Sequence, residues 1–166
     1  MITFNIAAIT DGQSSLEADV LPEELGLGDN IEFNKTIHVV HQINKVGPEV
    51  FIKSTLQTTL NLQCDVCLDS FLYNVTDSVN VILTTDSNLA EGEDDVYLVS
   101  DVTSEIDITE SIRQSLLLDI PFKKKCSSAC KGLCPTCGAN LNKGPCTCKN
   151  ETIDPRWEAL KKVKFD

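Results

Sequence analysis

Six of the eight cysteines lie within the 23 positions of CSSACKGLCPTCGANLNKGPCTC, residues 126–148, and the other two form CDVC at 64–67. Clusters of this density are typical either of metal ligation or of a disulfide framework. The first residues, MITFNIAAITDGQSS, lack the basic segment of a signal peptide, so export is not expected, and a reducing cytoplasm would not keep four disulfides. The pattern therefore favours zinc, with a disulfide framework and an iron–sulfur cluster as the alternatives.

The spacing of the thiols predicts a first zinc site. Structural zinc takes four tetrahedral ligands, and two thiolates two residues apart can bind it from one tight turn. CPTCG at 134–138 has this form: Pro135 stiffens the turn, and Gly138 can adopt the positive φ that brings backbone N–H groups toward the sulfurs. A second pair then returns to the same ion, so the predicted ligands are Cys134, Cys137, Cys146 and Cys148.

The remaining thiols predict a second zinc site, which would tie the β-rich part of the chain to its tail. Its ligands would be Cys64, Cys67, Cys126 and Cys130. A single zinc remains an alternative, since the CDVC pair can also be two small half-buried residues. A redox or metal-sensing switch is a weaker alternative, because a thioredoxin-like CxxC opens a helix after a strand, whereas β-rich runs flank this pair on both sides.

The sequence gives no sign of catalysis. Sites made only of thiolates are closed and structural, whereas catalytic zinc keeps an open position. His38 and His41 are three residues apart in a β-rich run, so they should point to opposite faces as ordinary strand residues. No Ser/His/Asp set or phosphate-binding glycine loop is visible. We therefore expect a protein that is not an enzyme.

Hydrophobic periodicity predicts an α+β fold. Residues 49–64 alternate in polarity, and with the flanking runs 31–43 and 70–85 they predict an antiparallel β meander. After a short apolar start, LPEELGLGDN at 21–30 looks like loop or a brief turn of helix, and VYLV at 96–99 could add a short strand. IDITESIRQSLLLDIP predicts one packed helix at 109–118, with Thr109 as its N-cap. IDPRWEALKKVKF predicts a short basic terminal helix after the zinc module.

Charge divides the chain into two predicted domains. Residues 1–120, the acidic β-rich body, carry 21 acidic and four basic residues, a net charge of −17. Residues 121–166, the basic zinc module with the terminal helix, carry ten basic and four acidic residues, a net charge of +6. A basic segment of this kind can bind a polyanion, although acidic residues also simply keep the body soluble. No apolar stretch is long enough to span a membrane, so no membrane partner is expected and the predicted location is cytoplasmic.

The order of the motifs resembles the YceD family of bacteria and plastids. CDVCLDSF, a helix ending in LLLDIP, CKGLCPTCGANLN, a final C-x-C and DPRW follow one another with matching gaps, over roughly residues 60–163. The resemblance implies a non-enzymatic factor for accumulation of the 23S ribosomal RNA, acting in its processing or in large-subunit assembly.

We therefore expect ribosomal RNA or a pre-ribosomal particle as the partner. Lysine and arginine side chains of the tail would contact phosphates, and Trp157 would either stack on a base or, more in keeping with an amphipathic helix, pack on the zinc module. The rival interpretation is an acidic adaptor or chaperone for a basic ribosomal protein, working through residues 1–120. The candidate RNA contacts are Lys123, Lys124, Lys125, Lys131, Lys143, Lys149, Arg156, Lys161, Lys162 and Lys164.

Overall fold

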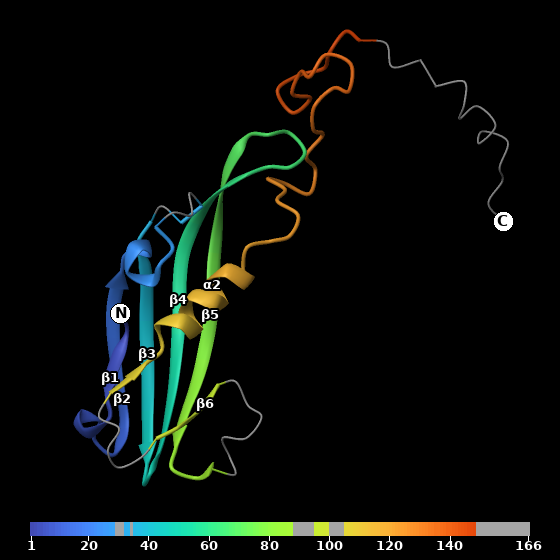
Figure 1. Ribbon diagram of the computed structural model, residues 1–166. Helices are drawn as coiled ribbons and strands as arrows, with labels where there is room; N and C mark the ends of the chain where they lie inside the picture. The colour runs from blue at the N-terminus through green and yellow to red at the C-terminus, as the bar shows by residue number, and fades with distance from the viewer. Residues whose placement is uncertain (29–31, 34, 88–94, 100–104, 149–166) are drawn as a thin grey trace, which may run out of the picture.

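A long twisted sheet forms the body of the protein. The computed structural model describes residues 1–28, 32–33, 35–87, 95–99 and 105–148. Within these residues the main sheet has five strands in the order β2-β3-β4-β5-β6 (Figure 1). The strands are β2 (Gly12–Val20), β3 (Ile37–Val46), β4 (Glu49–Gln63), β5 (Ser70–Thr84) and β6 (Val96–Leu98).

The predicted meander is present in β3, β4 and β5, which pair antiparallel in sequence order. A two-residue turn joins β3 to β4, and Gly47 supplies its positive φ of 61°. Alternate residues of β4 from Val50 to Leu62 are buried, as the polarity pattern predicted. The alternation was readable because one face of each strand packs on the core while the other is exposed.

Three parts of the sheet differ from the prediction. β2 was not predicted: it is an edge strand whose residues are exposed from Gly12 to Asp19 and therefore show no alternation. β6 pairs parallel to β5, so the sheet is mixed rather than wholly antiparallel. β1 (Thr3–Asn5) and β7 (Glu105–Asp107) form a small antiparallel pair of their own. Strands of three residues are too short for their partners to be read from periodicity.

Helix α2 (Thr109–Leu118) has the predicted bounds, but Thr109 is its first helical residue rather than its N-cap. Ile108 takes the cap position, and the Thr109 hydroxyl instead accepts a hydrogen bond from the Ile2 backbone N–H at 2.7 Å. Ile112 and Leu116 are buried against the sheet. A long-range contact with the N-terminus therefore decides the role of this threonine, and local sequence could not show it.

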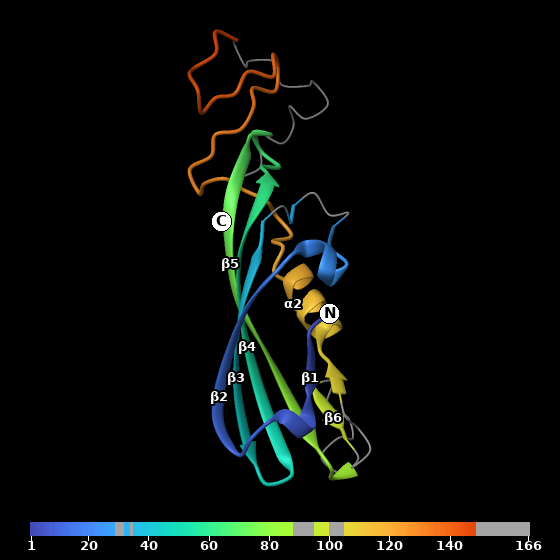
Figure 2. The same ribbon diagram turned by 90° about the vertical axis from the view of Figure 1, so that its left-hand side faces the viewer.

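The core lies on one side of the main sheet. α2, β1 and two short 3₁₀ helices, Ile6–Ala8 and Pro22–Leu25, lie on that side, whereas no described element covers the other face (Figure 2). The fully buried side chains, including Leu25, Leu56 and Ile112, belong to one cluster. The brief turn of helix predicted in LPEELGLGDN corresponds to Pro22–Leu25.

The β4–β5 hairpin reaches beyond the rest of the sheet. β3 pairs with β4 only as far as Gln57, whereas β5 pairs with it to Gln63. At about 3.3 Å per residue, each 15-residue strand is about 50 Å long. The hairpin therefore carries the CDVC turn to the end of the molecule, where residues 121–148 lie (Figure 1).

The predicted terminal helix and Trp157, with Lys149, Arg156, Lys161, Lys162 and Lys164, lie outside the described residues. In the part of the chain that the structure describes, no helix is both long and apolar enough to cross a membrane.

Candidate metal centres

The CDVC turn at the tip of the β4–β5 hairpin is a chelating turn. The Cys64 N–H donates to the Asp69 carbonyl at 2.9 Å, and the Leu68 N–H donates to the Cys64 carbonyl, also at 2.9 Å. Leu68 has a φ of 62°, in the left-handed region. These bonds fold the loop so that both sulfurs, from Cys64 and Cys67, lie in the same group of ligands.

The CPTC turn repeats this hydrogen-bond pattern. The Cys134 N–H donates to the Ala139 carbonyl at 2.8 Å, and the Gly138 N–H donates to the Cys134 carbonyl at 2.9 Å. Gly138, with a φ of 72°, takes the position that Leu68 takes in the first turn. Two turns of different sequence thus have one backbone geometry, which brings Cys134 and Cys137 into one group.

The four thiols that we call the proximal cluster come together from the hairpin tip and the tail. They are Cys64, Cys67, Cys126 and Cys130, and their sulfurs all lie within 4.8 Å of one another. The Cys64 and Cys130 sulfurs are 4.0 Å apart, and those of Cys67 and Cys126 are 3.7 Å apart. The hairpin thiols are buried, with exposed fractions of 0% for Cys64 and 2% for Cys67, so this site is partly inside the protein.

The tail alone supplies the distal cluster, which consists of Cys134, Cys137, Cys146 and Cys148. Its sulfurs also lie within 4.8 Å of one another. Cys134 is buried and Cys137 is exposed. The Thr136 N–H donates to the Cys134 sulfur at 3.4 Å. The structure thus brings the eight sulfurs together in the same two sets of four that the spacing suggested.

Both clusters fit a tetrahedral metal ion. A zinc–sulfur bond of about 2.3 Å places tetrahedral sulfurs about 3.8 Å apart, close to the two distances in the proximal cluster. A disulfide needs sulfurs about 2.05 Å apart, so the pairs in the proximal cluster are not disulfides. Four cysteine ligands suit zinc, and they also suit iron in Fe–S sites.

The thiol pKa values within each cluster diverge. Burial alone would raise the pKa of Cys64, but backbone N–H groups, among them that of Cys126, lower it to about 6. Backbone N–H groups of Cys137 and Thr136 lower the pKa of Cys134 to about 6. Burial raises the pKa of Cys126 to about 12, and the neighbouring Cys137 raises that of Cys148 to about 12. Thiolates this close repel one another, so a cation is needed for all four to ionise.

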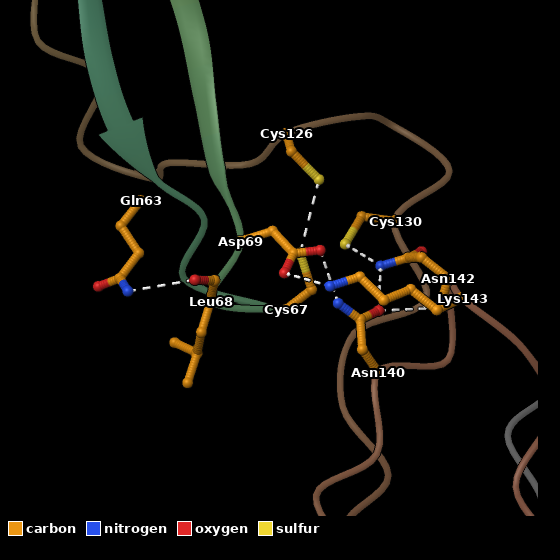
Figure 3. Close-up of polar contacts among 9 residues, drawn as sticks. All are labelled: Gln63, Cys67, Leu68, Asp69, Cys126, Cys130, Asn140, Asn142 and Lys143. Atoms are coloured by element: carbon orange, nitrogen blue, oxygen red, sulfur yellow. Dashed lines mark hydrogen bonds and ion pairs between the residues drawn. The ribbon is translucent and has the colours of Figure 1, made fainter.

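A hydrogen-bond network links the hairpin tip to the tail (Figure 3). Asp69, next to the CDVC turn, accepts a hydrogen bond from the Asn140 amide at 2.7 Å and forms an ion pair with Lys143 at 3.0 Å. The Asn140 carbonyl oxygen accepts from the Asn142 amide at 3.0 Å. The Asn142 amide in turn lies 3.4 Å from the Cys130 sulfur. The side chains of GANLNK thus reach both the body and the proximal cluster.

Gly132 allows the tail to approach the CDVC turn closely. Its φ is 76°, and a Cβ at this position would lie 2.8 Å from the Val66 Cγ1 and 3.0 Å from the Val66 carbonyl oxygen. Any side chain here would therefore push the two segments apart.

The family model for the large ribosomal RNA subunit accumulation protein YceD matches residues 52–164, more than half of the chain. The chain belongs to the YceD family. The matched region contains both cysteine clusters, the Asp69–Asn140 network and α2, whereas β2, β3 and the start of β4 lie outside it.

Relatives of this YceD-family chain occur in plants and mycobacteria. It is 44% identical over 68 residues to the chloroplastic large ribosomal RNA subunit accumulation protein YCED homolog 1 of Arabidopsis thaliana. This aligned stretch covers 41% of this chain and 21% of that protein. It is 50% identical over 50 residues to the Zea mays homolog 1, 30% of this chain and 17% of that protein.

A Mycobacterium tuberculosis protein, described as uncharacterized, is 34% identical over 126 residues, 72% of this chain and 58% of the relative. The chain thus spans about a fifth of the length of each plant relative and under two thirds of the mycobacterial one. No solved structure matches it.

Of the lysines predicted to contact RNA, the five that the structure describes fall into two groups in this YceD-family chain. Lys124 pairs with Glu32, and its backbone N–H donates to the Asp65 carboxylate at 2.7 Å, so it joins the tail to the body. Lys143 pairs with Asp69 as described above. The side chains of the second group, Lys123, Lys125 and Lys131, are exposed. The first group has a structural role that sequence reasoning did not predict, because the partners are far away in the chain.

The histidines are strand residues on opposite faces, as predicted. His41 is buried, and its Nδ1 lies 2.8 Å from the Ser54 hydroxyl, whereas His38 is on the other face, 2.8 Å from an Asp19 oxygen. Burial lowers the pKa of His41. The CDVC turn joins two antiparallel strands, which is not the strand-to-helix setting of a thioredoxin-like site.

Proposed function

We propose that this chain is a non-enzymatic cytoplasmic factor that supports accumulation of 23S ribosomal RNA and assembly of the large ribosomal subunit. The observation that carries the proposal is the YceD family match, which covers both cysteine clusters and the segments that hold them. The family description names the large-subunit RNA, and the processing or assembly step is our extension of it.

In this proposal each cysteine cluster holds one structural zinc ion. Four thiolates complete a tetrahedral shell and leave no position for a substrate or a reactive water. The ions would organise residues 121–148, a segment in which the structure has no helix and only an isolated β-bridge between Leu133 and Asn140. Zinc would therefore replace the hydrophobic core that so short a segment cannot build.

The RNA contacts proposed for the described residues lie on the zinc-binding segment. Residues 121–148 contain five lysines and no acidic residue, against 21 acidic residues in 1–120. Lys123, Lys125 and Lys131 have exposed side chains and can reach phosphate groups. Lys124 is less suited, because its ammonium already pairs with Glu32.

Co-sedimentation of the full-length, zinc-loaded protein with large-subunit precursor particles tests this function. Reversing Lys123, Lys125 and Lys131 to Glu should abolish association at physiological salt. With naked 23S RNA, the slope of log affinity against log salt should fall by roughly one unit for each phosphate that the variant no longer binds. Lys35→Glu, which reverses an exposed lysine of the body, is the control for charge reversal outside the zinc-binding segment and should leave association unchanged. Particle association that survives all three reversals would contradict the assignment of these contacts.

An acidic adaptor for a basic ribosomal protein is a second candidate, favoured by one feature of the body. A hollow of about 740 Å³ beside α2 is lined by four carboxylates together with Leu118. One of its acids, Asp119, has a buried oxygen with no hydrogen-bond partner in the described part of the chain, and burial together with Asp77 raises its pKa. A lysine or arginine of a partner would satisfy that oxygen. The carboxylates are Asp77, Asp95, Glu110 and Asp119.

The two candidates predict opposite results for one pair of variants. If the adaptor function is correct, Asp119→Asn should abolish particle association, and the three lysine reversals should leave it intact. If the RNA function is correct, Asp119→Asn should leave association unchanged.

A further inference from the structure

The outer face of the main sheet, the face turned away from α2, contains a shallow hollow. Figure 2 shows α2 and β1 on one side of the sheet and no described element on the other. The hollow has a volume of about 620 Å³ and lies over β2, β3, β4 and β5. Pockets of about 300–1,000 Å³ are of the size that takes a nucleotide or another small ligand.

Two cross-strand rows of side chains build the hollow. In the first, Gln42 lies opposite Lys53, and Lys53 lies opposite Asn80. In the second, the next row along the strands, Phe51 lies between Asn44 and Ile82. Residues two apart on a strand point to the same face and are about 6.6 Å apart. An aromatic ring and an ammonium group are therefore neighbours, with amides on both sides of Lys53 and on one side of Phe51.

The charge of the hollow contrasts with that of the body around it. None of its lining residues is acidic, although residues 1–120 carry 21 acidic residues. The outward positions of β2, β3, β4 and β5, all of which are described, contain three carboxylates: Glu17 and Asp19 on β2, and Glu49 at the first residue of β4. None of the three lines the hollow. The rest of these outward positions are mainly Asn, Gln, Ser and Thr. The hollow itself would therefore repel a polyanion less than the remainder of the body.

We infer that this hollow binds one unpaired nucleotide of RNA, with the ring of Phe51 stacked on the base and the Lys53 ammonium on a phosphate. Phe51 is 38% exposed, so its ring is available for stacking. The amides of Gln42, Asn44 and Asn80 can donate to and accept from the edge of a base or a 2′-hydroxyl. Sheet faces that present aromatic and polar side chains are a common way of holding single-stranded RNA.

The inference rests on the proposed function for its ligand, but it concerns a different surface. The lining residues of β2 and β3, with Phe51 of β4, precede residue 52, where the family match begins. The exposed lysines of residues 121–148 would hold the RNA backbone through charge. The hollow would add a contact that depends on stacking and hydrogen bonds, and is therefore much less sensitive to salt.

A single-stranded oligouridine carrying one 2-aminopurine, titrated into the full-length, zinc-loaded protein, tests the hollow, because the fluorescence of 2-aminopurine falls when the base stacks. We expect the wild-type protein to quench the probe. Phe51→Ala should remove the quenching and weaken binding at least about fivefold, and Lys53→Gln should weaken binding while keeping the quenching. Leu72→Ala is the matched control: its side chain is 64% exposed at an outward position near the start of β5, whereas the hollow lies near the end of that strand. The variant should behave like the wild type.

The outcomes separate the hollow from the proposed function. If the protein binds the probe and particles but Phe51→Ala changes neither the quenching nor the affinity, the hollow is overturned and the lysine contacts stand. If the wild-type protein binds neither the probe nor particles, both are overturned. If a mononucleotide competes as well as the oligonucleotide, the hollow takes free nucleotides, and its assignment to RNA is overturned.

Discussion

Leu68 has a backbone conformation that normally belongs to glycine. Among the described residues it is the non-glycine residue with a positive φ, and it stands where Gly138 stands in the second turn. A left-handed conformation costs a residue with a Cβ about 1–2 kcal/mol. The side chain of Leu68 is 54% exposed, so its burial offsets little of this cost.

Leu68→Gly should therefore raise the free energy of unfolding by about 0.5–1 kcal/mol, the relief of strain being partly offset by the greater freedom of glycine in the unfolded chain. Denaturant unfolding of the zinc-loaded protein measures the effect. Leu72→Gly, at an exposed strand position, should instead lower the free energy of unfolding by about 0.5–1 kcal/mol. Destabilisation of both variants would show that Leu68 makes a contact worth more than its strain.

Gly132 and Gly138 share a positive φ but differ in their surroundings. A Cβ at Gly132 would collide with Val66, whereas a Cβ at Gly138 would meet no atom within 4 Å. Gly132→Ala should therefore cost about 2–4 kcal/mol, since overpacking adds to backbone strain. Gly138→Ala should cost only the strain, about 1–2 kcal/mol. Zinc retention during denaturant titration compares the two, and equal destabilisation would contradict the close approach of Gly132 to the CDVC turn.

At the scale of elements, the hairpin and the tail are held together by polar side chains as well as by the proximal cluster. Asp69 and Asn140 make the link, as acceptor and donor. Because Lys143 also pairs with Asp69, the contact is charge-assisted on one side. The network orients Asn142, whose amide lies beside the Cys130 sulfur.

Asn140→Asp should place a carboxylate against Asp69 and weaken the link by about 2–3 kcal/mol. We expect faster transfer of zinc to a chromophoric chelator from this variant than from the wild type. The double variant with Asp69→Asn exchanges donor and acceptor and should recover most of the stability, because Lys143 can then pair with the new carboxylate at position 140. Additive destabilisation in the double variant would contradict a direct contact between the two positions.

At the scale of the whole molecule, the body and the tail are stabilised differently. The body has one cluster of buried apolar residues. In the described residues 121–148 the buried positions are Gly132 and Cys134 alone. Removal of metal should therefore unfold the tail while the sheet persists. Limited proteolysis in the presence of a chelator should cut the chain within residues 126–148 and leave β3, β4 and β5 intact. Loss of the β-sheet signal in circular dichroism on metal removal would contradict this division.

Acid should have the same effect as chelation. Each ligand must lose its proton to bind zinc, so the unfolded tail binds more protons than the metal-bound one, and its stability falls as pH falls. Free thiols have a pKa of about 8.5, so zinc release should increase as pH drops below about 7. Zinc measured after dialysis across this range checks the direction. Retention that improves in acid would rule out thiolate ligation.

Features that depend on local spacing could be predicted without a structure. The alternation of β4 identified its buried face, because a strand between a core and solvent has a period of two. The ends of α2 were readable from helical spacing and from Pro121. The two CxxC turns could be recognised as chelating pairs because such a turn is a local structure, whereas the second set of four cysteines was assigned as the thiols that remained.

Features that depend on distant partners became visible only in the folded chain. The edge strand β2 has no alternation because it is exposed, and its place is set by its pairing with β3. Lys124 looked like an RNA contact, yet its pairing with Glu32 makes it a link between tail and body. The hollow around Phe51 exists because four strands bring together residues from 13 to 82. The physical reason is the same in each case: these properties come from contacts between segments far apart in the chain, and no local pattern encodes which segments will meet.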